Sequence, residues 1–103
     1  MLLYNVTVKI ITEKKRHWLS WMIHTHIPEI MATGCFTEYK ISRVLGEDES
    51  EGVTFAIQYL ATSRDAYIEY QANHALRFQE EHKKRYENQY VAFRTLLQVL
   101  DQS

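Results

Sequence analysis

Hydrophobic and polar residues alternate along four segments of this chain. Period-two alternation is the pattern of a β-strand with one face packed and the other wet. In the first segment Tyr4 and Val6 begin the apolar face, and Asn5 and Thr7 begin the polar one. The last segment carries apolar residues on both faces, so we expect it to be covered on both sides. The four predicted strands are Leu3–Ile11, Phe36–Leu45, Val53–Ala61 and Tyr90–Leu100.

Two segments between these strands show helical spacing of their apolar residues. In Lys14–Met31, an i, i+4, i+8 row of Trp18, Met22 and His26 predicts the buried face of a first helix. Pro28 predicts a kink or a restart, because proline lacks an N–H and disfavours the α conformation of the residue before it. Gly34 then suits the end of this helix.

The second helical segment is predicted over Asp65–Tyr86. Ser63 is placed to cap its first turn, and Lys83–Arg85 lie near its carboxyl end, where cations are favoured. The inner row of this helix reads Tyr67, Tyr70, His74, Phe78 and His82.

The order strand, helix, strand, strand, helix, strand is the split-βαβ arrangement. It predicts an α+β fold of the ferredoxin-like βαββαβ type, a four-stranded antiparallel sheet with two helices on one face. With 103 residues we expect one domain, residues 1–103. The segment Gly46–Gly52 has a glycine at each end and acidic residues between them. This composition suits a long hairpin loop that joins the second and third predicted strands.

Charge and composition narrow the class of protein. The formal net charge is −1, so no overall field recruits nucleic acid or an anionic membrane. No apolar stretch approaches the roughly 20 residues of a membrane span, and the first residues lack the pattern of a signal peptide. The lone Cys35 rules out an internal disulfide and fits a reducing compartment. We therefore expect a cytoplasmic protein, with no nucleic-acid or membrane partner.

His74 is the leading candidate for chemistry, because Tyr70 and Phe78 lie four residues to either side on the inner face of the helix. A buried imidazole there could act as an acid or base. The alternative is a core histidine that donates to a carbonyl or to a tyrosine hydroxyl. Tyr39 and Tyr59 are candidate hydrogen-bond donors to a ligand.

His26 is a second candidate, at the rim of such a site. Its structural alternative is to bond a carbonyl freed at Pro28. His82 lies about 12 Å along the helix from His74, too far to share a metal ion, and we expect it partly exposed at the helix end. His26 with Glu29 lacks a third ligand, so no metal site and no cofactor are predicted.

A polar patch is predicted on the sheet face away from the helices. Enclosed in a dimer, Arg94 there would need a carboxylate such as Glu38 or an anionic ligand. Cys35 is expected as a buried structural thiol rather than a nucleophile. The residues assigned to this patch are Asn5, Glu38, Gln58 and Arg94, with Lys40 and Ser42 beside them.

Two short segments carry a family resemblance, His26-Ile27-Pro28-Glu29 and Thr33-Gly34-Cys35-Phe36. They resemble the dimeric α/β-barrel superfamily, in which a His-x-Pro element precedes glycine and phenylalanine at the second strand. The whole chain resembles an uncharacterised bacterial family of unknown function within it. The resemblance implies a homodimer, and the superfamily includes small monooxygenases, haem-degrading enzymes, isomerases and ligand-sensing modules.

The haem-degrading branch of that superfamily uses an asparagine on the first strand with a tryptophan and a histidine on the second helix. Asn5 and His74 occupy comparable elements here. However, both tryptophans are in the first helix, and Asn5 falls on the polar face of its strand.

Three functions therefore remain open. The first is a small homodimeric ligand-sensing or interaction module, with a small apolar or aromatic ligand. The second is a cofactor-free monooxygenase- or isomerase-like enzyme, with a pocket between helices and sheet that uses His74, His26, Tyr59 and Tyr39. The third is haem binding. A fold alone cannot choose among them.

Overall fold

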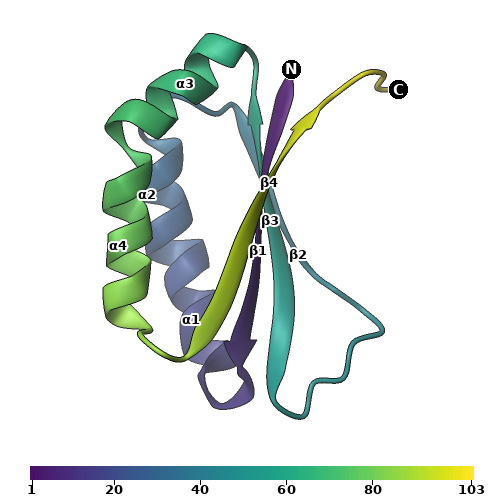
Figure 1. Cartoon of the computed structure of the whole chain (residues 1–103), viewed down its shortest axis with the longest axis vertical. Helices are drawn as coiled ribbons and strands as arrows, with labels where there is room; N and C mark the ends of the chain where they lie inside the picture. The colour runs from purple at the N-terminus through teal and green to yellow at the C-terminus, as the bar shows by residue number, and fades with distance from the viewer.

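Four antiparallel strands form a single sheet, and all of the helices cover one side of it (Figure 1). The computed structural model describes residues 1–103. The strand order is β2-β3-β1-β4, which is the ferredoxin-like order expected from the sequence. We call the side that carries the helices the covered face and the other side the outer face. The strands are β1 (Leu2–Ile11), β2 (Glu38–Arg43), β3 (Gly52–Ala61) and β4 (Tyr90–Gln98).

The first helical segment is interrupted before Pro28. After a 3₁₀ turn (Thr12–Lys14), helix α1 (Lys15–Trp21) leads into a π-helical turn (Met22–His26), and helix α2 (Ile27–Met31) follows. The predicted restart is confirmed, since Pro28 lies in the first turn of α2, where a missing N–H costs nothing. Ile27 nevertheless keeps helical angles. α2 ends at Met31, and the chain turns away from it through Gly34, whose φ is 78°.

The second helical segment is also two helices, α3 (Arg64–Asn73) and α4 (Ala75–Arg85). The Ser63 hydroxyl accepts a hydrogen bond from the Ala66 N–H at 3.1 Å, so the predicted cap is confirmed. His74 breaks the helix, with φ at −132° and ψ at −36°. Neither proline nor glycine lies at this point, so the sequence carried no signal for the break.

The core lies between the covered face and the helices. Along β3 buried and half-buried side chains alternate strictly, and Phe55, Ile57 and Tyr59 point under the helices. Phe36, just before β2, packs against Tyr59 with ring centroids 5.1 Å apart. Cys35 is buried, as expected. No helix is both long and apolar enough to cross a membrane.

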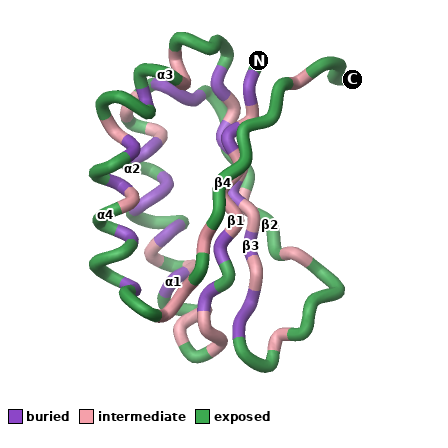
Figure 2. The backbone as a smooth tube through the Cα atoms, viewed as in Figure 1, coloured by how far each residue is buried: buried purple, intermediate pink, exposed green.

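β4, like the other edge strand β2, is exposed over most of its length, unlike the central strands β1 and β3 (Figure 2). The expected cover on both sides is absent in the single chain. Its register also corrects one prediction. Arg94 pairs with Val6 of β1, whereas Asn5 pairs with Thr95. Directly paired residues project to the same face, so Arg94 lies on the covered face rather than beside Asn5.

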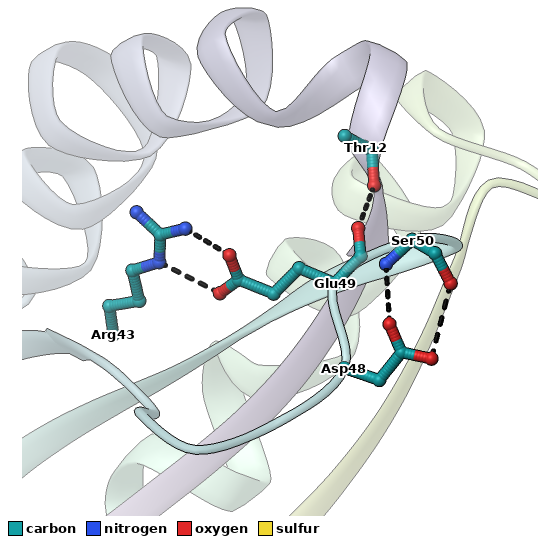
Figure 3. A network of polar contacts seen from close by, with 5 residues as sticks. All are labelled: Thr12, Arg43, Asp48, Glu49 and Ser50. Atoms are coloured by element: carbon teal, nitrogen blue, oxygen red, sulfur yellow. Dashed lines mark hydrogen bonds and ion pairs between the residues drawn. The ribbon is translucent and has the colours of Figure 1, made fainter.

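The acidic hairpin loop is held by its own polar contacts (Figure 3). Arg43 forms an ion pair with Glu49, and the Thr12 hydroxyl donates to the Glu49 carbonyl at 2.9 Å. The Asp48 carboxylate accepts a hydrogen bond from the Ser50 N–H at 3.0 Å. This bond is the main reason that the pKa of Asp48 is lowered. The loop is a solvated hairpin turn, as its composition predicted.

Candidate functional site

A small cavity of about 40 Å³ lies between the helices and the sheet, where β1, β3 and β4 face the π-helical turn and α4. Its walls are mostly apolar, with Val6, Val8 and Ile57 from the sheet and Phe78 from α4. Polar side chains enter this apolar wall from both layers. They are Tyr4, His26, Tyr59, Tyr70, Gln79, His82 and Arg94.

His82 is a buried and uncharged member of this group, with 8% of its surface exposed. The Trp18 indole donates to His82 Nε2 at 2.8 Å. An indole N–H can only donate, so Nε2 carries no proton and the proton of the neutral ring is on Nδ1. Burial, and next the charge of Arg94, lower the pKa of His82 to about 4.

His26 is buried more deeply, with 6% of its surface exposed. Its ring stacks on Trp21 at 4.5 Å between centroids and lies 5.9 Å from the ring of His82. Burial, and next the neighbouring His82, lower the pKa of His26 to about 3. His26 Nδ1 is enclosed and has no hydrogen-bond partner in the protein. A buried polar atom without a partner is uncommon and marks a place where a ligand group could bond.

The π-helical turn explains how His26 comes to face the cavity. His26 closes this turn directly before α2, and π turns are frequent at functional sites because they re-aim side chains. The predicted bond from His26 to a carbonyl freed near Pro28 is wrong. The neighbouring His24 is the histidine of this turn that contacts a backbone carbonyl, with its Nδ1 2.9 Å from the Ser20 carbonyl.

Three tyrosines line the inner wall, Tyr4, Tyr59 and Tyr70. Tyr59 and Tyr70 are both buried, and burial is the main reason that the pKa of each phenol is raised, so both stay protonated. The tyrosine hydroxyls that bond to other side chains are those of Tyr67 and Tyr86, outside the cavity. The hydroxyls of Tyr59 and Tyr70 are therefore left without a protein partner.

The structure brings together only some of the residues that the sequence suggested. His26 and Tyr59 both line the cavity. His74 does not: it is half-buried at the break between α3 and α4, with its ring 6.2 Å from that of Tyr70. Its Nδ1 has no protein partner, so the predicted bond to a carbonyl or tyrosine is also absent. Tyr39 is 45% exposed on the edge strand β2.

His82, like Arg94, lies elsewhere than the sequence predicted. It was expected to be partly exposed because it lies near a helix end, yet it is buried. Its spacing from Phe78 on the inner row was the available signal. Its partner Trp18 is 64 residues away in the chain, so the hydrogen bond that buries it is a tertiary contact.

On the outer face, Asn5, Glu38 and Gln58 lie where they were expected. Asn5 and Gln58 are paired across β1 and β3, and the Asn5 amide donates to the Thr7 hydroxyl at 3.0 Å. Glu38 pairs with Leu60 at the far edge of the sheet from β4. The suggested pairing of Glu38 with Arg94 is therefore wrong, because the two residues are on different faces.

The residues do not form a metal or haem site. No group of three or more His, Cys, Asp or Glu side chains is placed to hold a metal ion. A cavity of about 40 Å³ cannot hold a porphyrin, and Asn5 lies on the opposite face from His74 and the cavity. Asn5 and His74 therefore do not face a common site, as the comparison with the haem-degrading branch would require.

Comparison with known proteins places the chain in a family. A family described as "Domain of unknown function (DUF4286)" matches residues 1–100. The chain belongs to the DUF4286 family. This membership agrees with the resemblance to a family of unknown function. No curated protein matches the sequence.

Solved structures share the fold of this DUF4286 chain at low sequence identity. A putative antibiotic biosynthesis monooxygenase from Deinococcus radiodurans has a TM-score of 0.70 at 16% identity, covering 100% of this chain and 96% of that one. A dimeric ferredoxin-like protein from an uncultured marine organism has 0.68 at 13%, covering 100% and 98%. SnoaB, a cofactor-independent oxygenase from Streptomyces nogalater, has 0.65 at 13%, covering 98% and 95%. These similarities confirm the ferredoxin-like α+β fold.

Proposed function

We propose that this chain is a homodimeric module that binds a small ligand in the cavity between its helices and its sheet. The observation that carries the proposal is the enclosed Nδ1 of His26, a polar atom without a protein partner. The residue His26 lines the same cavity as the hydroxyl-bearing rings of Tyr4, Tyr59 and Tyr70. Convergent polar groups in an apolar recess are the usual composition of a ligand site.

The protonation of the two histidines favours binding over acid–base catalysis. A general base works best when its pKa is near the operating pH. The pKa values of His26 and His82, at about 3 and about 4, make both rings weak bases at neutral pH. Both neutral rings can still form hydrogen bonds with a ligand.

The homodimer is proposed to form through the outer face of the sheet. Phe93, with 63% of its surface exposed, and Leu97 both project there from β4, opposite Thr7 and Leu3 of β1. Burial of exposed apolar side chains of this kind drives association. Two of the similar solved structures are themselves described as dimeric ferredoxin-like proteins.

Light scattering during gel filtration tests this part of the proposal. The unmodified chain is expected to elute with the mass of two copies, and Phe93→Glu with the mass of one. Leu76→Glu is the matched control, because Leu76 is 68% exposed on α4, on the helical side. A monomer for the unmodified chain at all micromolar concentrations would refute the homodimer.

Ligand binding is tested by following the indole N–H signals of the two tryptophans in NMR spectra. Trp18 bonds to His82 and Trp21 stacks on His26, so both signals report on the cavity. A library of small carboxylates, amides and phenols is expected to contain compounds that shift both signals. Ala92→Leu, which adds three carbons to the cavity wall, is expected to abolish the shifts. Ala72→Leu, at an exposed site on α3, is the control. Shifts that persist in Ala92→Leu would contradict binding in this cavity.

A cofactor-free enzyme is the second candidate. It is favoured by the position of His26 beside the cavity, where its free Nδ1 could accept a proton from a bound substrate. A nearby anionic substrate would raise the pKa of the ring. Proton abstraction would show as exchange of α-hydrogens of pyruvate for deuterium in D₂O, and His26→Gln would stop it. If pyruvate exchanges its hydrogens no faster with the unmodified chain than in buffer alone, the chain does not abstract a proton from pyruvate.

A further inference from the structure

We infer that the ligand of this cavity is a short carboxylate of two or three carbon atoms. Its carboxylate group pairs with the guanidinium of Arg94, and its alkyl end enters the apolar part of the cavity. This inference rests on the proposed binding function and specifies the chemical class of the ligand.

The charge of the cavity wall supports an anion. Arg94 is the one charged side chain among the residues that line it, and no aspartate or glutamate is present there. The structure has a single salt bridge, Arg43 with Glu49, so Arg94 has no ion-pair partner. A cation without a partner beside a low-dielectric recess attracts an anionic ligand more strongly than one exposed on a flat surface does.

The hydrogen-bonding groups favour a carboxylate among anions. The guanidinium of Arg94 presents parallel N–H donors that match two carboxylate oxygens. Tyr59 and Tyr70 line the cavity with hydroxyls that have no protein partner, and a phenolic O–H donates well to a carboxylate. His82 carries its proton on Nδ1, and the structure gives this N–H no protein acceptor either.

The volume of the cavity limits the size of the ligand. At about 40 Å³ the cavity is small. For comparison, an apolar cavity that binds benzene is about 150 Å³. We therefore expect an aromatic ring to be too large for the cavity. The alkyl end of acetate or propionate is expected to fit beside Val8 and Ile57.

Titrations of the unmodified chain with propionate and propionamide test the inference. The two probes have nearly the same shape, and only propionate is charged. At constant ionic strength and pH 7.5, propionate is expected to shift the indole signals of Trp18 and Trp21 at concentrations at least tenfold lower than propionamide. Benzoate is expected to bind at least tenfold more weakly than propionate, because its ring exceeds the cavity.

Arg94→Gln then assigns the selectivity to one side chain. Because Arg94 is exposed on an edge strand, the variant is expected to fold. It should weaken propionate binding at least tenfold and leave propionamide unchanged. Arg64→Gln, at the exposed start of α3, removes the same charge elsewhere and should change neither.

The outcomes separate this inference from the proposed function. Equal binding of propionate and propionamide, or propionate binding that survives Arg94→Gln, would overturn the carboxylate and leave a ligand-binding module in place. If no carboxylate shifts the indole signals but phenols or amides still do, the carboxylate is likewise overturned and the ligand-binding module stands. No response to any compound in the library would overturn both. If Arg94→Gln does not fold, the comparison of propionate with propionamide on the unmodified chain decides alone.

Discussion

Along β3, every second side chain lies under the helices, and the side chains between them lie on the outer face. Ile57 on the covered face is fully buried, whereas its neighbour Gln58 is only half-buried. On β4 the same alternation leaves residues of both faces exposed. The covered face is therefore closed by this chain's own helices along β3, whereas along β4 both faces remain open. Changes on the two faces should then have different consequences.

The largest expected effect comes from removing core volume on the covered face. Ile57→Ala should lower the free energy of unfolding by about 3 kcal/mol, because it loses buried methylene groups and leaves a cavity. Gln58→Ala, one residue along the same strand, should change it by less than about 0.5 kcal/mol. Urea denaturation at one fixed protein concentration measures both. Equal losses would show that the two faces are packed alike.

Acid sensitivity is expected to come from the two histidines under the covered face. The pKa values in the folded chain, about 3 for His26 and about 4 for His82, lie below the value of 6.5 expected when the chain is unfolded. Between these values the unfolded chain binds more protons. Stability is thus fully present above pH 6.5 and falls as the pH drops from 6.5 toward 4, by about 1.4 kcal/mol per pH unit for each histidine.

The variant His82→Gln isolates one of these contributions. It should reduce the slope of stability against pH between 6 and 4.5 by about half, because one buried titrating ring is gone. His24→Gln is the control, since His24 is exposed on the π-helical turn. Thermal unfolding followed at several pH values gives the slopes. An unchanged slope in His82→Gln would mean that this ring is protonated equally in both states.

On the outer face, a single polar contact offers a smaller effect. Asn5→Ala removes the bond from the Asn5 amide to the Thr7 hydroxyl, which should cost about 0.5–1 kcal/mol in urea denaturation. Both groups are half-buried in the single chain, so water can replace part of the bond. A loss as large as that of Ile57→Ala would indicate that this region is enclosed, as in the proposed dimer.

The smallest effect is expected in the hairpin loop, which belongs to neither packed face. Arg43→Gln breaks the ion pair with Glu49 (Figure 3). Both groups are solvent-accessible, and ion pairs at the surface contribute little because water and salt screen them. The unfolding midpoint should be indistinguishable from that of the unmodified chain. A clear loss of stability would show that the loop anchors the end of the sheet.

Sequence reasoning identified most of the fold because the chain gives local and repeated signals. The alternation in β1 and β3 separated their two faces correctly, and Ser63, Pro28 and Gly34 marked helix boundaries where the structure has them. It failed on β4, whose apolar residues occur on both faces and leave the phase undetermined. The misplacement of Arg94 follows directly from that ambiguity.

The candidate site was predictable only in part. His26 and Tyr59 were recognisable because each belongs to an apolar row of its own element. The sequence favoured His74 over His82 as the residue facing the sheet, and the structure shows the reverse. The break of the helix at His74 changes which residues face the sheet. Nothing in the residues around position 74 signals that break.

The sequence by itself determined the order of the elements, the covered face of β1 and β3, and membership of the DUF4286 family. Those properties rest on periodicity and on residues close in the chain. Only the tertiary structure decided that Trp18 bonds to His82, that His26 is left with a free nitrogen, and that Arg94 joins them. Each of these depends on contacts between distant segments and on strand register, which alternation specifies only where one face is clearly apolar. The βαββαβ order thus set the scaffold, and the pairing of its strands set the site.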